Sequence, residues 1–291
     1  MEPAHSMTAA QAPSSIMLRP ATRPAIPVID ARPDGLATDV GRRLRDHHPV
    51  TVFATTAFAG WLILEAAMLL LGLLLVHVVL HVGAIDRGDE RIARWFADQR
   101  TPTLNDLSYA GSMIGDIPVL PGLVVVAVII LLARHRIRAA AFVATAGVIE
   151  LATYRVTSLI IHRERPLVPR LDDLPVNQSY PSGHMAASIA VYGALALVIS
   201  SRFRARWVGI TVWTLAVVLP TIVALSRMYR GMHHLTDILA GALMGICALL
   251  IALAAARACD AAITARRERA TAEVDPAAAP RPVNARPEVT R

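Results

Sequence analysis

The sequence contains no lysine: all 29 basic residues are arginine, and the formal net charge is +7. Charge of either sign is scarce as well, because charged residues make up 18% of the 291 residues while hydrophobic residues make up 55%. Soluble domains carry roughly 25% charged residues. Two cysteines, Cys247 and Cys259, are too few for a disulfide framework and lack zinc-site spacing. These deficits exclude a disordered chain and a disulfide scaffold, and they indicate a membrane protein.

Aromatic residues are also few, at 5% of the chain. The arginines lie at the edges of apolar runs and form no basic patch with interleaved aromatics, so a nucleic-acid partner is not expected. Anionic lipid headgroups are the expected attractor of the positive charge. The partners predicted from composition are therefore membrane lipids.

Six apolar segments alternate with polar loops between residues 50 and 257. A helix needs about 20 apolar residues to cross a bilayer, and the segments run roughly over 51–82, 117–133, 138–161, 185–201, 207–226 and 235–257. The second and fourth are short and are expected to extend into their loops. The prediction is an all-α, polytopic membrane protein with a bundle of six transmembrane helices over residues 50–257.

The segments outside this bundle are predicted to be disordered cytoplasmic tails, a proline-rich one over 1–49 and a basic one over 258–291. In the loop at 84–116, Ile92, Trp95 and Phe96 have helical spacing beside charged residues. This pattern is typical of a short helix on the membrane surface, with an irregular surface loop as the alternative.

Arginine counting gives the orientation. Cytoplasmic loops are enriched in Arg and Lys. With the N-terminus inside, 19 arginines fall on the cytoplasmic side, nine fall outside, and Arg155 lies within a span. Both termini are therefore predicted to be cytoplasmic, in a multi-pass protein of the cell membrane.

Three polar clusters interrupt the apolar pattern, and this topology places all of them on the extracytoplasmic face. They are residues 162–166 (HRERP), 180–184 (YPSGH) and 226–237, which contains Ser226-Arg227, His233, His234 and Asp237. Any single cluster would be read first as a membrane-edge anchor. Polar groups at spans that converge on one face indicate function.

The chemistry of these clusters suits a phosphate. A Ser-Gly step at a helix N-terminus offers free backbone N–H groups, and arginine grips phosphate oxygens with a planar fork. Asp237 lies four residues after His233, where a carboxylate can fix the imidazole tautomer and leave one nitrogen as a nucleophile. His184, on a separate helix, can act as a general acid. His234 is the ambiguous neighbour, and no Asp, Glu and His set resembles a metal cage.

Arg165-Pro166, then Pro181-Ser182-Gly183-His184, then Ser226-Arg227 with His233 and Asp237 together resemble the three-part signature of the type 2 phosphatidic acid phosphatase (PAP2) superfamily. That family includes membrane lipid phosphatases and vanadium haloperoxidases. The resemblance implies a phosphohistidine on His233, oriented by Asp237, with His184 protonating the leaving group. It also implies phosphate binding by Arg165, Arg227, Ser182 and Gly183, with no metal and no cofactor.

One position departs from the family pattern. The first motif normally begins with a Lys seven residues before its Arg, and Ser158 stands there. Arg155, one turn deeper in the span, is predicted to supply the missing cation. The alternative is a structural pair between Arg155 and Glu150.

The function predicted from the sequence is metal-independent hydrolysis of a lipid phosphate or diphosphate at the extracytoplasmic face. Phosphatidic acid, phosphatidylglycerol phosphate and polyprenyl diphosphate all remain open as substrates, as does the oligomeric state. A phosphotransferase with the same phosphohistidine is the enzymatic alternative. A non-catalytic membrane or transport protein on the same scaffold is the alternative from another class.

Overall fold

The structure is a computed structural model that describes residues 27–32, 35–116, 118–173, 178–203 and 205–274. Within these ranges the chain is all-helical and contains no strand. The α-helices are α1 (Leu36–Arg43), α2 (Pro49–Leu74), α3 (Ala84–Asp98), α4 (Pro102–Met113), α5 (Val119–Ala133), α6 (Ile137–Ile160), α7 (Gly183–Arg202), α8 (Arg206–Tyr229) and α9 (Leu235–Val274). Helix α2 continues through a π turn (Leu75–Val79) and a 3-10 turn (Leu80–Val82).

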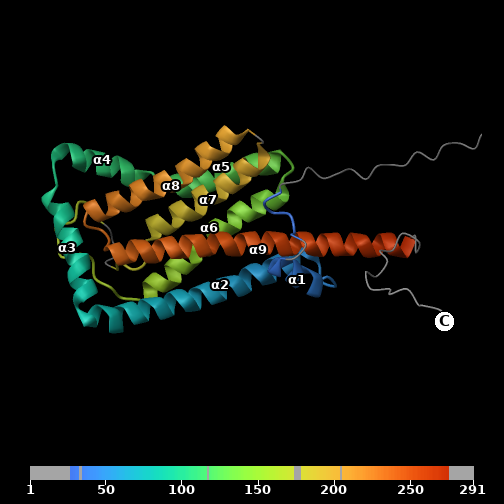
Figure 1. The fold of residues 1–291 in the computed structure, drawn as a ribbon, viewed down its shortest axis with the longest axis horizontal. Coiled ribbons are helices and arrows are strands. Elements are labelled where there is room, and N and C mark those ends of the chain that lie inside the picture. Colours follow the sequence, from blue (N-terminus) through green and yellow to red (C-terminus); the bar gives the residue numbers. More distant parts are fainter. Residues whose placement is uncertain (1–26, 33–34, 117, 174–177, 204, 275–291) are drawn as a thin grey trace, which may run out of the picture.

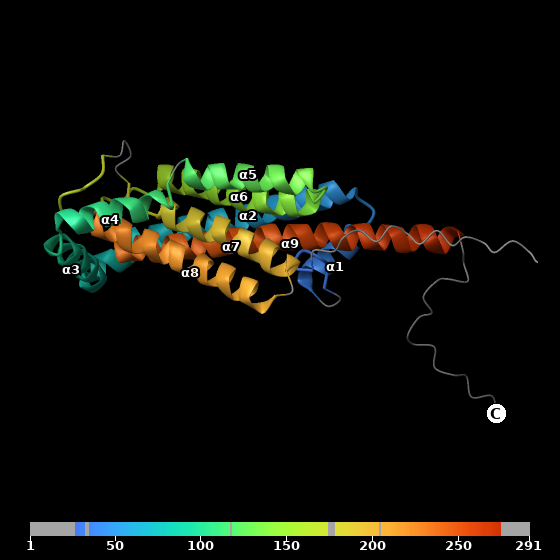
Figure 2. The ribbon, with the colours of Figure 1, turned by 90° about the horizontal axis from the view of Figure 1, so that it is seen from above.

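In the part of the chain that the structure describes, five helices are long and apolar enough to cross a membrane, where six were predicted. They are α2 with its continuation, α6, α7, α8 and α9. The fourth predicted segment does extend into its loop, since α7 has 20 residues. The second does not: α5 has 15 residues, or about 22 Å at 1.5 Å per residue, against about 30 Å of hydrocarbon. Helix α5 packs beside α6 at the outer edge of the bundle (Figure 2).

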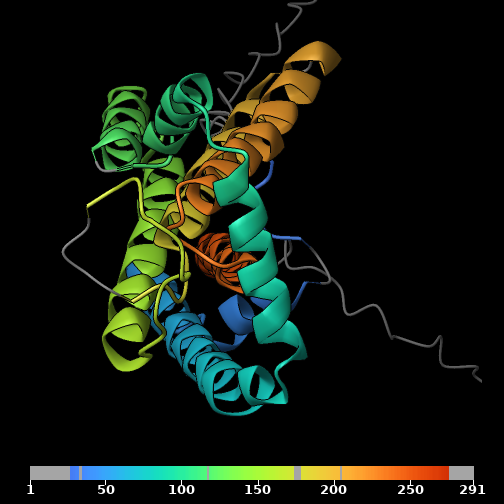
Figure 3. The ribbon, with the colours of Figure 1, turned by 90° about the vertical axis from the view of Figure 1, so that its left-hand side faces the viewer.

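Helix α9 is the centre of the bundle, and α2, α6 and α7 pack around it (Figure 3). Small residues allow this close approach. A Cβ at Gly241 would lie 2.4 Å from the carbonyl oxygen of Ser182, and one at Gly245 would lie 2.4 Å from that of Ala186. Because the backbones of α7 and α9 are in contact there, the N-terminal turns of these two helices are held side by side.

Helices α3 and α4 cover one end of the bundle (Figure 1). The chain turns from α2 into α3 at Gly83, whose φ of 73° is a left-handed conformation that favours glycine. Helix α3 keeps Asp89 buried while Trp95 is exposed. A helix is therefore present in the 84–116 loop, and its position on a membrane surface stays a prediction.

Parts of both predicted tails pack against the bundle. Ile29 is buried in the core, and Arg138 of α6 pairs with Asp30 at 3.0 Å and with Asp260 at 2.9 Å. Helix α1 lies against α9, where a Cβ at Gly41 would lie 2.4 Å from the Ala258 oxygen. Helix α9 also continues to Val274 because its alanine-rich sequence strongly favours helix. The expectation for 1–26 and 275–291 lies outside the described residues.

Candidate active site

The three polar clusters meet at the end of the bundle that α3 and α4 cover. The first lies on the chain that follows α6, the second begins α7, and the third spans the α8–α9 turn. The Ser182 N–H of the second cluster donates to the Asp237 carbonyl of the third at 3.1 Å, and Arg163 of the first cluster pairs with the Asp237 side chain. Nδ1 of His233 lies 2.8 Å from the carbonyl oxygen of Ser179, the residue before the second cluster.

The α8–α9 turn holds His233 at the centre of this assembly. Gly231, in the turn, has a φ of 72°, and a Cβ there would lie 2.9 Å from Val168 and 3.1 Å from Nη2 of Arg100. Only glycine fits both the conformation and the space. The Arg165 guanidinium donates to the carbonyl of Met232, the residue immediately before His233. The first motif therefore fixes the backbone that carries the histidine.

The contact between His233 and Ser179 determines which ring nitrogen is free. A backbone carbonyl can only accept a hydrogen bond, so Nδ1 of His233 must carry the proton. Nε2 then has an available lone pair, as a nucleophile requires. Burial lowers the pKa of His233 well below its usual value, and the charges of Arg227 and Arg165 lower it further. His233 is consequently neutral at neutral pH.

Asp237 does not orient His233, which corrects the expectation from their spacing. One carboxylate oxygen of Asp237 accepts from the backbone N–H of His234 at 2.9 Å and lies 3.2 Å from Nδ1 of that ring, and the other pairs with Arg163. The i, i+4 argument fails because α9 begins at Leu235, so His233 precedes the helix. Asp237 instead caps the helix from its third position.

His234 is not free to act as a nucleophile. Its Nδ1 lies 3.2 Å from Asp237, and its Nε2 lies 3.1 Å from Oε1 of Glu90 on α3. Both ring nitrogens thus face carboxylates, and neither is left available to attack a substrate. These contacts favour His233 over His234 as the candidate nucleophile.

Arg227 presents an unused fork of N–H groups beside His233. The residue is 3% exposed, and its Nη1 donates to Oγ of Ser112 and to Oδ2 of Asp172, both at 3.0 Å. Its Nε and Nη2 are buried with no hydrogen-bond partner among the described residues. Leaving buried donors unsatisfied costs about 1–3 kcal/mol each. Nε and Nη2 form one edge of the guanidinium and match the two oxygens of a phosphoryl group.

Ser182 and Gly183 supply further donors at the start of α7. Ser182 is the residue before the helix, and its buried Oγ has no hydrogen-bond partner among the described residues. The N–H groups of the first helical turn have no acceptor within the helix. A Cβ at Gly183 would lie 2.9 Å from the Tyr154 ring, so the close packing there requires glycine.

His184 and Arg227 line a cavity of about 300 Å³. Nε2 of His184 lies 3.3 Å from Oδ1 of Asp116, a residue between α4 and α5. Asp116 lines the cavity too, and the remaining lining residues are Tyr109, Ser112, Met113, Leu171, Asp172, Asp173 and Arg230. A leaving group in this cavity would lie beside the candidate general acid.

Arg155 is not brought to the site, contrary to the prediction. Its side chain is exposed on the outer surface of α6, while Ser158 is buried. Three residues correspond to 300° of helical rotation, so the two side chains lie about 60° apart and on different sides of the buried boundary. The alternative pair is not formed either, because Glu150 is buried away from this surface.

Several charged residues of the site were not predicted. Arg163 is buried and bridges Asp237 of α9 to Asp89 of α3, at 2.7 Å from the latter. Asp172 pairs with both Arg227 and Arg230. All the N–H donors of the Arg230 guanidinium are used, because it also donates to the Asn105 carbonyl, the Ser108 hydroxyl and the Leu171 carbonyl. The sequence offered one signal for Arg163, its place in the HRERP cluster, and none for Asp172.

Among the described residues no group of three or more His, Cys, Asp or Glu side chains is arranged to hold a metal ion.

Comparisons with known proteins identify a family model and several proteins that this chain resembles. A family model described as the PAP2 superfamily matches residues 139–260, which include all three motifs. Human sphingosine-1-phosphate phosphatase 2 is 40% identical over 88 residues, 30% of this chain and 21% of the human protein. Undecaprenyl-diphosphatase of Sulfolobus acidocaldarius is 37% identical over 75 residues, 26% of this chain and 32% of that protein. The chain thus spans about a fifth to a third of the length of these relatives.

One solved structure shares the fold. The crystal structure of a transmembrane PAP2 type phosphatidylglycerolphosphate phosphatase from Bacillus subtilis superposes with a TM-score of 0.55 at 24% identity, covering 70% of this chain and 93% of that one. The resemblance to the PAP2 superfamily is therefore confirmed over residues 139–260, which match its family model, and the described chain shares an all-helical membrane fold with the solved structure.

Proposed function

We propose that the protein is a membrane phosphatase that hydrolyses a lipid phosphate or diphosphate through a phosphohistidine on His233. The observation that carries this proposal is the buried Nε–Nη2 edge of Arg227, unpartnered among the described residues and close enough to His233 to lower its pKa. A phosphoryl group bound to that edge satisfies both donors. The lipid character of the substrate is supported by the apolar helices that surround the site and by the named activities of the relatives.

The chemistry follows from the tautomer of His233. Its Nε2 lone pair attacks phosphorus, and the bond from phosphorus to the leaving oxygen breaks. His184 donates a proton to that oxygen, and Arg227, Ser182 and the first N–H groups of α7 bind the phosphoryl oxygens. Water then attacks the phosphohistidine and passes a proton to His184, and the bond from phosphorus to Nε2 of His233 breaks, which returns to Nε2 the lone pair that it first supplied. Inorganic phosphate is the product.

The purified protein in detergent should release inorganic phosphate from at least one member of a panel of phosphatidic acid, phosphatidylglycerol phosphate, sphingosine 1-phosphate and a polyprenyl diphosphate. A soluble short-chain phosphate ester is the control for an aqueous substrate. No release from any lipid in the panel, in protein that remains folded by circular dichroism, would contradict the proposal.

We further propose that the site faces the outside of the cell and that both termini are cytoplasmic. The support is the excess of arginine at the other end of the bundle, where the α5–α6 and α7–α8 connections lie with α1 (Figure 1). Two positions can report which side of the membrane each end of the bundle faces: Gly88 on α3, at the end that holds the site, and Arg206 at the start of α8, at the opposite end. A Cβ at Gly88 has nothing within 4 Å, and Arg206 is exposed.

With Cys247 and Cys259 replaced by serine, Gly88→Cys should react with an impermeant maleimide on intact cells, while Arg206→Cys should react only after the cells are opened. Permeabilised cells carrying each variant control for the intrinsic reactivity of the two positions. The reverse pattern would place the site in the cytoplasm.

A further inference from the structure

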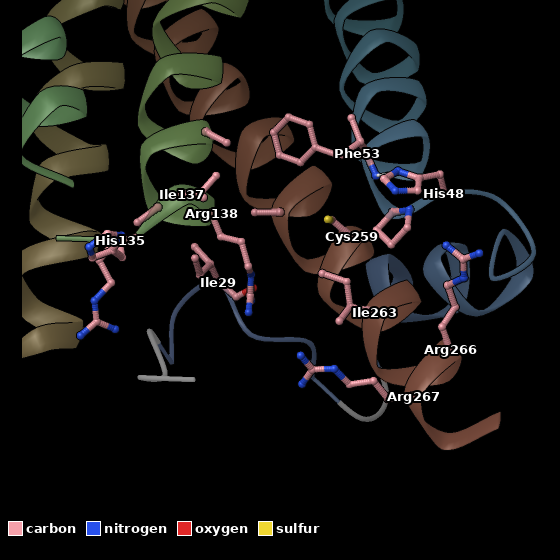
Figure 4. Close-up of a pocket in the computed structure, with 16 residues that line it drawn as sticks. Ile29, His48, Phe53, His135, Ile137, Arg138, Cys259, Ile263, Arg266 and Arg267 are labelled. Atoms are coloured by element: carbon pink, nitrogen blue, oxygen red, sulfur yellow. Dashed lines mark hydrogen bonds between the residues drawn. The ribbon is translucent and has the colours of Figure 1, made fainter. Parts of the chain in front are cut away.

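A second cavity lies at the opposite end of the bundle from the candidate active site. It has a volume of about 700 Å³ and lies between the first turns of α2 and α6 and the middle of α9 (Figure 4). Cavities of roughly 300–1,000 Å³ are the size that binds small organic ligands. The catalytic mechanism uses none of its residues.

The wall of this cavity is mostly apolar. Phe53 of α2 and Cys259 of α9 point into the space between the helices in Figure 4. The other apolar lining residues are Ile29, Pro49, Val50, Ile137, Ala139, Ala141, Ala256 and Ile263. Such a wall suits hydrocarbon and gives no hydrogen bonds to a polar solute.

The rim of the cavity is cationic. Arg136, Arg138, Arg266 and Arg267 line it with His48 and His135, and none of its sixteen lining residues is acidic. Arg138 is neutralised by Asp30 and Asp260. Arg266 and Arg267 are exposed and have no acidic partner among the described residues. They therefore leave a net positive charge at the mouth of an apolar cavity.

An apolar wall with a cationic rim suits a molecule that has a hydrocarbon part and an anionic part. The position of the cavity along the helices indicates that this molecule is a membrane lipid. Helix α2 begins at Pro49 and α6 begins at Ile137, so the level of these residues is where apolar spans give way to polar chain. Ile137 is 69% exposed and faces the surroundings of the bundle. Arginines at this level lie at headgroup depth, and each contributes about 1 kcal/mol toward an anionic lipid surface.

We propose that this cavity binds an anionic phospholipid of the leaflet opposite the active site. Its phosphate contacts Arg266 and Arg267, and an acyl chain lies along Phe53, Ile137 and Ile263. The proposal does not depend on the catalytic assignment, because it uses a separate set of residues at the other end of the bundle.

Native mass spectrometry of the full chain, released from micelles containing equal amounts of phosphatidylglycerol and phosphatidylcholine, tests this site. The native protein should retain phosphatidylglycerol preferentially. Arg266→Gln/Arg267→Gln should weaken that retention about thirtyfold, since the contribution of each arginine corresponds to a factor of about five. Ala141→Phe, which fills the cavity and leaves every cation in place, should reduce retention as well.

The matched control is Arg202→Gln/Arg206→Gln. It removes the same charge at the same end of the bundle, from exposed positions that do not line the cavity, and it should leave retention unchanged. Equal loss in the control and test pairs would mean nonspecific attraction and would overturn the site. Equal retention of the two lipids by the native protein would overturn it too.

Discussion

His233→Asn should abolish phosphate release and any acid-labile phosphoenzyme, with a loss of turnover of roughly 10⁴-fold or more, the scale on which an enzyme loses activity with its nucleophile. The reason is the contact with the Ser179 carbonyl, which fixes the proton on Nδ1 and makes Nε2 the attacking atom. Asparagine retains an N–H donor for that carbonyl but offers no nucleophilic nitrogen. Radiolabelled lipid phosphate, quenched in base and in acid, measures both quantities.

His234→Asn is the matched control, because the two histidines are adjacent and both are buried. His234 is held between Asp237 and Glu90, so its loss should lower the unfolding temperature while a phosphoenzyme still forms. Persistence of the phosphoenzyme in His233→Asn would remove His233 from the role of nucleophile. Complete loss of activity with EDTA, restored by a divalent ion, would contradict a mechanism in which arginine, without a metal ion, neutralises the charge of the phosphoryl group.

The sequence predicted that the three polar clusters lie together, but it did not predict which side chains within them are in contact. The alternation of apolar segments with loops placed the C-terminal ends of α6 and α8 and the N-terminal end of α7 on one side, and the structure brings the three polar clusters at those ends together. The failed contact between Asp237 and His233 shows the limit. Helical spacing relates two side chains only within a helix, and α9 begins two residues after His233, so the Asp237 carboxylate contacts His234 instead.

The second failure concerns which face of a helix is buried. Arg155 and Ser158 were predicted to share a face of α6, but the buried boundary passes between them. That boundary depends on where α2, α7 and α9 pack, which is set by contacts distant in the sequence. Asp172 was missed for a related reason, since its partners Arg227 and Arg230 follow it by 55 and 58 residues along the chain.

The structure departs from the prediction of disordered tails at both ends of the described chain, and helix propensity accounts only for the departure at the C-terminal end. Proline content marks a poor helix former, but it predicts neither helix α1 within the proline-rich segment nor the docking of Ile29 into the core against α6 and α9. The alanine-rich continuation of α9 to Val274 was predictable from propensity alone. A tail defined by its charge can therefore still be helical.

Arg227→Lys should weaken inhibition by inorganic phosphate or vanadate and lower kcat/KM by about 10²–10³-fold. Lysine keeps the positive charge and the partner Asp172, but it replaces a planar fork by a point charge. The Nε–Nη2 edge, buried and unpartnered among the described residues, is what the substitution removes. A hydrogen bond to a charged group is worth roughly 1.5–3 kcal/mol, and one to two such bonds account for the expected loss.

Arg230→Lys separates phosphate binding from structure, because Arg230 shares Asp172 with Arg227 and comes from the same end of α8. Its donors are already used by Asp172, Asn105, Ser108 and Leu171. Arg230→Lys should therefore lower the unfolding temperature and change the phosphate inhibition constant less than about fivefold. If the two variants weaken phosphate inhibition equally, the fork of Arg227 is a structural feature of the Asp172 pair, and the phosphoryl group must be bound elsewhere.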